Sequence, residues 1–176
     1  MFKQYKGIYG ELKGYWIGYG GFKALIASPF LHLAILITAL SYPLWFNQSW
    51  WDSVISTIPG LLGFTLGGYA IWLAIGDEKF KSLISGSTEE RLSPFIRLNY
   101  AFLHFVLVQV TALIFALTLK GLSAWGDCWN DSVVIATGAF GYFLYIYAIL
   151  CAFAAVLAIL RYSRWYDTHI RNLKEK

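Results

Sequence analysis

The sequence predicts an all-α integral membrane protein, built as a bundle of four transmembrane helices with an interfacial N-terminal segment. Composition is the first reason, because 58% of the 176 residues are hydrophobic and only 14% are charged, which lies outside the range of soluble globular domains. The second reason is the spacing of the charges. They leave four long uncharged windows, each able to supply the roughly 20 residues that cross a hydrocarbon core of ~30 Å.

The predicted segments divide the chain into three parts. Residues 1–23 mix glycines, aromatic rings and lysines, which is typical of a segment at the membrane interface. Residues 24–160 form the transmembrane domain, and residues 161–176 form a basic tail. The four spans are predicted at 24–46, 54–76, 96–119 and 132–160. We expect the first span to be retained, because a cleaved signal would not start so late or continue into the bulky sequence SYPLWF.

Three short signals predict where helices end and begin around the middle loop. Gly76 is expected to let the chain turn away from the bilayer after the second span. Residues 87–90, with the sequence STEE, fit a capping box. Ser93 and Pro94 fit an N-cap followed by the first helical residue of the third span.

The basic residues predict the orientation of the bundle. Every Lys and Arg except Lys120 falls in residues 1–23, in loop 77–97 or in the tail. Because basic residues are retained on the cytoplasmic side during insertion, we expect both termini and the middle loop to be cytoplasmic. Tryptophans gather near the opposite ends of the spans, as expected for rings at headgroup depth. They are Trp45, Trp50, Trp51, Trp125 and Trp129.

Small residues follow the second predicted span at alternating spacings of three and four. The members of this stripe are Ser53, Ser56, Gly60, Gly63, Gly67, Ala70 and Ala74. Small side chains let helix backbones approach closely in lipid, and this spacing matches a left-handed helix crossing. Two alternatives remain open. The stripe packs against the fourth span within one bundle, or it packs against another subunit, including around the axis of a ring.

The fourth predicted span carries a looser stripe in the same register. Its members are Thr137, Gly141, Leu144, Ala148, Cys151, Ala155 and Ala158, of which only Leu144 is large. This stripe is therefore the natural partner for a small face on a neighbouring helix.

Polar residues follow the third predicted span at spacings of seven. This row consists of Arg97, His104, Thr111 and Thr118. A polar group facing lipid is costly, so we expect the row to face other helices or water. One interpretation is a set of structural hydrogen bonds, with His32 as a partner of His104; the other is a hydrated path or a pH-responsive latch at His104. Gln109 lies off the row and is expected to bond across a second interface.

No pattern in the sequence predicts catalysis, so we expect no enzyme. The predicted spans contain no Asp or Glu, and no metal-ligand spacing, CxxC pair or phosphate-binding loop is present, so we expect no metal and no other cofactor. Basic residues spread over three segments do not favour direct binding of nucleic acid. Cys128 and Cys151 are not expected to meet, although Cys128 in an outer loop could bridge two chains.

Charged and aromatic residues at the cytoplasmic ends of the second and fourth spans offer contacts for a soluble protein. The candidates are Asp77, Glu78, Lys79, Arg161, Arg164 and Trp165. An ordinary solvated helix end is the alternative interpretation of the charges that follow Gly76.

Together these features predict a non-enzymatic, homo-oligomeric membrane subunit that anchors or signals to a cytoplasmic partner. The alternative is a small oligomeric ion channel, with the second or third span facing the pore. Four spans, cytoplasmic termini, very short outer loops and the lack of catalytic residues resemble the small membrane subunits of bacterial anti-phage operons, such as KwaA of the Kiwa system. This resemblance implies a multi-pass sensor in the bacterial inner membrane that works with a soluble effector.

Overall fold

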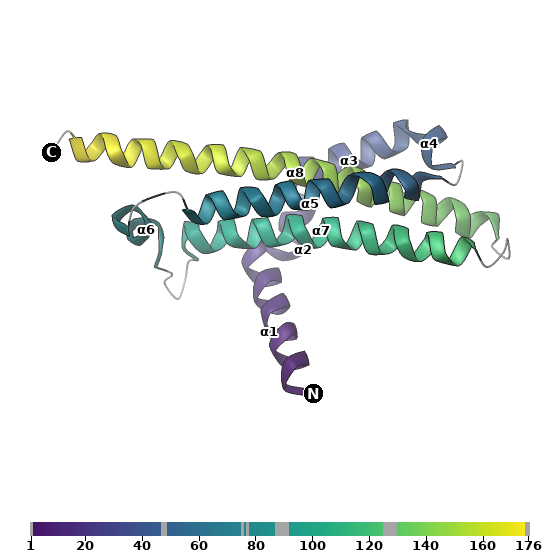
Figure 1. Cartoon of the computed structure of the whole chain (residues 1–176), viewed down its shortest axis with the longest axis horizontal. Coiled ribbons are helices and arrows are strands. Elements are labelled where there is room, and N and C mark those ends of the chain that lie inside the picture. The colour runs from purple at the N-terminus through teal and green to yellow at the C-terminus, as the bar shows by residue number, and fades with distance from the viewer. Residues whose placement is uncertain are drawn as a thin grey trace.

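Helices account for nearly all of the chain that the structure describes. The computed structural model describes residues 2–46, 49–74, 76, 78–86, 92–124 and 130–174, and these residues contain helices but no strands. Three long helices form the body of the molecule and lie side by side (Figure 1). They are α5 (Trp50–Ala74), α7 (Pro94–Ser123) and α8 (Asp131–Lys174). The prediction of an all-α fold is therefore confirmed for the described residues.

Each of these three helices is long and apolar enough to cross a membrane. The longest is α8, whose 44 residues correspond to about 66 Å at 1.5 Å per residue, roughly twice the thickness of a hydrocarbon core. Its C-terminal end extends past the ends of α5 and α7 (Figure 1). The predicted basic tail is thus a direct helical continuation of the fourth predicted span.

The first predicted span, 24–46, is broken into several helices. These are α2 (Gly21–Ile26), α3 (Pro29–Leu40) and α4 (Tyr42–Phe46). The break before α3 has a local cause, because Pro29 disfavours helical geometry at the preceding residue, and Ser28 is extended with φ −72° and ψ 121°. With 12 residues, α3 is about 18 Å long, which is too short to cross a hydrocarbon core by itself.

The segment between α5 and α7 turns where the sequence predicts. Gly76 has φ +95°, a left-handed conformation that glycine adopts readily, and it separates α5 from α6 (Glu78–Ile84). Ser93 caps α7, since its Oγ accepts a hydrogen bond from the backbone N–H of Ile96 at 3.3 Å. The turn predicted at Gly76 and the N-cap predicted at Ser93 are confirmed. The predicted capping box, residues 87–90, lies outside the described residues.

Two clusters of buried side chains fill the bundle, one toward each end. The cluster beside α3 and α6 contains Trp72, Phe80, Phe102 and Tyr162, and the indole N–H of Trp72 donates to Asn99 Oδ1 at 2.9 Å. The second cluster lies near the α5 N-terminus and includes Trp45, Trp50, Val54, Ile58 and Ala116. Trp45 and Trp50 are therefore buried between helices at this end of the bundle. Trp125 and Trp129 lie outside the described residues.

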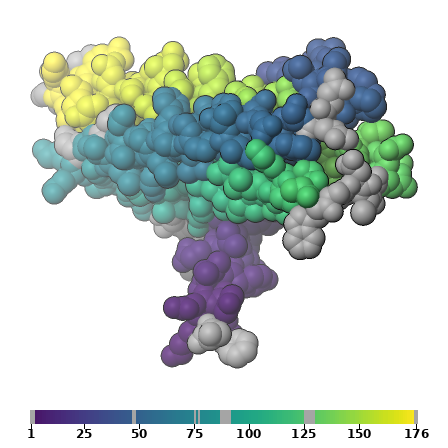
Figure 2. All heavy atoms as spheres, turned by 45° about the vertical axis from the view of Figure 1, so that its right-hand side comes forward, coloured from purple at the N-terminus to yellow at the C-terminus, as the bar shows by residue number. Residues whose placement is uncertain are grey.

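The N-terminal helix α1 (Phe2–Tyr19) leaves the bundle crosswise. Figures 1 and 2 both show it projecting away from the three long helices. Its C-terminal end packs against α7, and the chain then turns through Gly20 and Gly21, with φ values of 104° and 59°. Two successive residues with positive φ are strongly disfavoured for side chains other than glycine, so these glycines fix the change of direction.

Candidate functional site

A buried histidine joins α1 to the bundle. The ring of His104 on α7 is only 4% exposed, and both of its nitrogens are hydrogen-bonded. Tyr15 Oη on α1 lies 2.6 Å from Nδ1, and Tyr147 Oη on α8 lies 2.8 Å from Nε2. The ring of Tyr19 stacks on the imidazole with centroids 4.2 Å apart. One imidazole thus connects three helices that are distant in sequence, and we call these four residues the His104 node.

The His104 node suits a neutral imidazole. A neutral ring has one donor and one acceptor nitrogen, so it can accept from one tyrosine and donate to the other. Burial, followed by the effect of nearby Tyr19, raises the pKa of Tyr15 to about 12, so its hydroxyl stays protonated at neutral pH. The groups facing the imidazole from α1 and α8 are tyrosines, so a charged ring would lack a carboxylate partner.

The predicted polar row does not form a continuous buried path. Arg97, Thr111 and Thr118 are exposed, and the Thr118 hydroxyl donates to the carbonyl of Ile114 in its own helix at 2.8 Å. The core-facing side of α7 instead carries Phe102, Gln109, Ala112 and Ala116, which lie about a third of a turn from the row. His104 is buried because α1 covers it.

The partner predicted for His104 is also wrong. His32 is exposed on α3, and the imidazole of His104 bonds Tyr15 and Tyr147 instead. By contrast, the prediction for Gln109 is confirmed. Its Nε2 donates to Thr65 Oγ1 on α5 at 2.9 Å, which bridges a second interface.

The small-residue stripe of α5 faces outward. Every member from Ser53 to Ala74 is exposed, and a Cβ built on Gly60, Gly63 or Gly67 would have nothing within 4 Å. The buried residues of α5, such as Val54 and Trp72, lie on the opposite side of the helix. Helices α5 and α8 do pack together, but through that opposite side. The alternative in which the stripe packs inside one bundle is therefore wrong for this chain.

The stripe of α8 behaves differently. Gly141, Ala148, Cys151 and Ala155 are all buried. A Cβ on Gly141 would overlap the indole of Trp50, which comes from the first turn of α5. The small residue at position 141 therefore makes room for a large ring.

An aromatic cluster fixes α6 against the far end of α8. The ring of Phe80 lies 5.2 Å from Tyr162, 5.1 Å from Tyr166 and 5.3 Å from His169, measured between ring centroids. Phe80 is 1% exposed although it belongs to a helix of only seven residues. This packing therefore holds the charged residues of α6 at a defined position beside α8.

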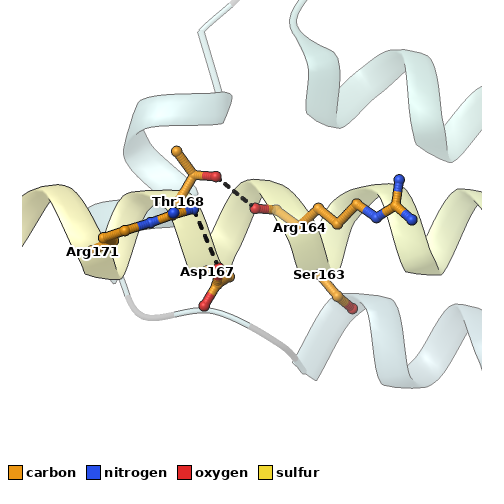
Figure 3. Close-up of a pocket in the computed structure, with 5 residues that line it drawn as sticks. All are labelled: Ser163, Arg164, Asp167, Thr168 and Arg171. Carbon is orange, nitrogen blue, oxygen red and sulfur yellow. Dashed lines mark hydrogen bonds and ion pairs between the residues drawn. The ribbon is translucent and has the colours of Figure 1, made fainter.

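The predicted partner contacts that the structure describes lie on α6 and α8, the two helices that this cluster joins. Glu78, Lys79, Arg161 and Arg164 are exposed, and Trp165 is 43% exposed, whereas Asp77 lies outside the described residues. Polar side chains follow one another along this part of α8, as Figure 3 shows. They are Ser163, Arg164, Asp167, Thr168 and Arg171. Arg171 pairs with Asp167 at 3.5 Å, so the surface carries both signs of charge.

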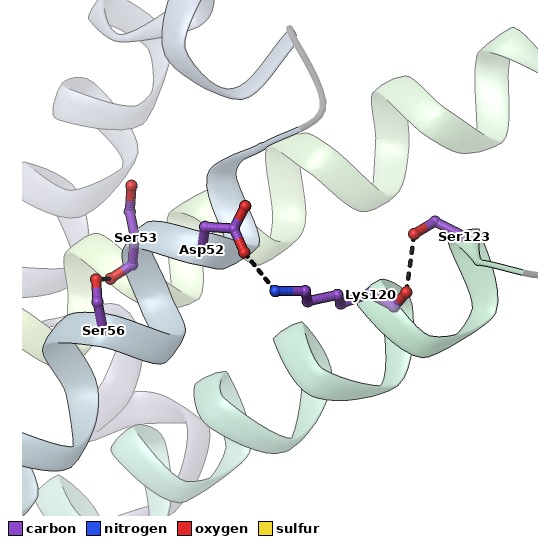
Figure 4. Close-up of polar contacts among 5 residues, drawn as sticks. All are labelled: Asp52, Ser53, Ser56, Lys120 and Ser123. Atoms are coloured by element: carbon purple, nitrogen blue, oxygen red, sulfur yellow. Dashed lines mark hydrogen bonds and ion pairs between the residues drawn. The ribbon is translucent and has the colours of Figure 1, made fainter.

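An ion pair joins two helices at the opposite end of the bundle. Lys120 Nζ on α7 lies 2.7 Å from Asp52 Oδ1 on α5 (Figure 4). In the same part of α5, the Ser56 hydroxyl donates to the carbonyl of Ser53 at 3.1 Å, and both serines belong to the α5 stripe.

Sequence reasoning missed the residues that complete these sites. Tyr15, Tyr19 and Tyr147 hold His104, but their sequence positions gave no reason to bring them together. The four-residue spacing of Tyr15 and Tyr19 was the available signal, since it places both rings on one side of a helix. Phe80 and Tyr162 were missed for the same reason, because these two aromatic residues hold α6 on α8 and no polar motif marks them in the sequence.

The fold therefore defines an all-helical protein whose described part contains three helices capable of crossing a membrane. Within that part, no group of three or more His, Cys, Asp or Glu side chains could hold a metal ion. Comparisons of the chain with protein-family models, with curated proteins and with solved structures find no match.

Proposed function

We propose that this chain is a non-enzymatic, homo-oligomeric membrane subunit that binds a soluble cytoplasmic protein. In this proposal both termini are cytoplasmic, and residues 24–46 make a fourth, broken crossing through α2, α3 and α4. The observation that carries the proposal is the end of α8, which continues beyond the bundle as a helix with α6 fixed to it. An exposed helix of this kind gives a cytoplasmic protein a rigid surface to bind.

The chemistry of that surface supports binding to a protein. Arg164 and Trp165 are exposed near Arg161, and arginine and tryptophan are among the residues enriched at protein interfaces. Asp167 and Arg171 add both signs of charge along the same helix, which favours specific orientation of a partner.

The outward stripe of α5 supports assembly into a homo-oligomer. Lipid gives apolar helices no hydrophobic reason to associate, so close backbone packing through glycine and alanine is a main source of affinity. Gly60, Gly63 and Gly67 have open space around them in the single chain. If a second copy packed through the same surface, these glycines would be buried in both subunits.

The resemblance to membrane subunits of anti-phage operons adds a sensing role in the bacterial inner membrane to this proposal. A sensor needs a connection between the bilayer and the cytoplasmic surface. The His104 node supplies one element of it, because it ties α1 to α8, the helix that continues to the proposed binding surface.

An ion channel is the alternative function. A pore would have to lie between subunits, because large side chains, including Ile58, Trp72 and Phe102, occupy the described interior of the bundle. Ion flux through liposomes containing only this protein would favour the channel.

The test is co-purification of a soluble protein with Arg164→Glu and Glu78→Lys variants. We expect the double variant to lose the co-purifying protein while its own oligomeric mass stays unchanged. Lys23→Glu is the control, since it reverses an exposed charge on α2, outside the α6 and α8 surface. Retention of the same soluble protein by the double variant would contradict the proposal.

A further inference from the structure

Among the residues that the structure describes, none packs against the N-terminal half of α1. Residues 3–13 are all exposed, and a Cβ on Gly7 or Gly10 would meet nothing within 4 Å. A helix of this length is only marginally stable in water, and the glycines at Gly7, Gly10, Gly14 and Gly18 weaken it further. A surface outside the described part of the chain is therefore needed to hold this half of α1 helical.

The exposed part of α1 has two chemically different sides. Tyr5, Ile8, Tyr9 and Leu12 fall within about 100° of one another on a helix that turns about 100° per residue. Each of these four side chains is at least 43% exposed. The lysines fall within about 80° on another side. They are Lys3, Lys6 and Lys13. Aromatic and aliphatic residues beside lysines are typical of helices that lie in a membrane interface.

The position of α1 on the bundle matches the depth of such a helix. Its C-terminal half contacts Tyr100 and His104 of α7, which lie three and seven residues beyond Arg97. At about 1.5 Å per residue, these contacts lie roughly 5 to 10 Å inside the level of Arg97, which is the depth at which interfacial helices bury their apolar side. Because α1 runs crosswise to the long helices, it lies along the bilayer when they span it (Figure 1).

We infer that α1 binds the cytoplasmic leaflet through anionic phospholipid headgroups, with its lysines on the phosphates and its aromatic side in the acyl boundary. This inference rests on the proposed orientation of the bundle. Anionic lipid is the occupant that the charges favour, because three lysines and one acid, Glu11, line the exposed half of the helix. A neutral bilayer would bury the apolar side of the helix but would offer no net negative charge to its lysines.

The half of α1 that binds lipid is also connected to the interior of the bundle. Tyr15 and Tyr19 follow the lipid-binding half on the same helix and contact His104 directly. The 18 residues of α1 therefore contain both the segment that binds headgroups and the segment whose tyrosines hold α1 on the bundle.

The test is amide hydrogen exchange of residues 3–13 in the full-length protein. The protein is reconstituted in nanodiscs of phosphatidylcholine alone or with about one third phosphatidylglycerol. We expect exchange to be slower by about ten-fold or more in the anionic discs, and the difference to shrink at high salt. No cytoplasmic partner is present, so failure of the partner proposal would leave this result unaffected.

The decisive variant is Lys3→Gln, Lys6→Gln and Lys13→Gln together, which should abolish the dependence on anionic lipid. Arg164→Gln, Arg171→Gln and Lys174→Gln on α8 form the matched control, with the same change in charge, and should preserve it. Equal exchange in the two kinds of nanodisc would overturn the inference. A second outcome would also overturn the inference: slow exchange that is the same with and without anionic lipid but becomes fast in nanodiscs that hold a single copy of the protein. That outcome would mean that α1 packs against a second subunit.

Discussion

The small-residue stripes of α5 and α8 share one sequence pattern and have opposite environments. Gly63 and Gly67 of α5 point away from the bundle, whereas Gly141 and Ala148 of α8 are buried in it. Both stripes have the period of a helix contact. The period therefore identifies residues that share a side of a helix, but it does not decide whether that side is packed.

The neighbours of each helix make the difference. Trp50 enters the space left by Gly141, so α8 needs a small residue there. On α5 the large buried residues, Ile58 and Trp72, lie opposite the glycines and fill the interior. In lipid, the side without large side chains becomes the one through which a second copy can approach closely.

The largest expected effect comes from adding one methyl group to each stripe. Gly141→Ala should lower the free energy of unfolding by about 1 to 3 kcal/mol, because the new Cβ overlaps the rigid indole of Trp50. Gly63→Ala should leave it unchanged or raise it by less than about 1 kcal/mol, since the added group meets open space and alanine favours helix. Reversible unfolding in detergent, followed by tryptophan fluorescence, measures both.

The same experiment separates folding from assembly on α5. Gly63→Leu combined with Gly67→Leu should keep the unfolding free energy within about 1 kcal/mol but reduce the oligomeric mass measured by light scattering. If these variants unfold as readily as Gly141→Ala, the outward position of the α5 stripe is wrong.

A smaller contrast separates two members of the polar row on α7. His104→Phe should cost about 1 to 2 kcal/mol, because it leaves the hydroxyls of Tyr15 and Tyr147 without their partner. Thr111→Val should cost less than about 0.5 kcal/mol, since Thr111 is exposed. The unfolding free energies are measured as before, and limited trypsin cleavage within α1 should accelerate only in His104→Phe. Equal losses in the two variants would show that the row acts as a unit.

The parts of the structure that depend on local sequence could be predicted. Hydropathy places α5, α7 and α8, and Ser93 with Pro94 marks the start of α7, because these signals act within a few residues. The break of segment 24–46 at Ser28 and Pro29 also has a local cause. The uncharged residues on both sides of it nevertheless favoured the prediction of one continuous helix.

The functional surfaces depend on contacts between distant segments, which periodicity alone does not reveal. His104 is buried by Tyr15, 89 residues earlier, so its environment follows from the path of α1 and not from the polar row. Phe80 is likewise buried by the continuation of α8. In both cases an aromatic residue outside the predicted spans completes the site, and no polar motif marks it in the sequence.

The smallest expected effect concerns the ion pair that accompanies the outward stripe. Asp52 lies on the exposed side of α5 and bonds Lys120 of α7, so the pair favours the rotation of α5 that leaves its glycines outside. The two side chains are 57% and 52% exposed, and exposed pairs contribute little because water and salt screen them. Asp52→Asn should therefore lower the unfolding free energy by less than about 1 kcal/mol at low salt and by less still at high salt. Glu11→Gln on α1 is the charge-matched control, and a salt-independent loss above about 2 kcal/mol would mean that the pair, and not the packing of Ile58 and Trp72, sets the rotation of α5.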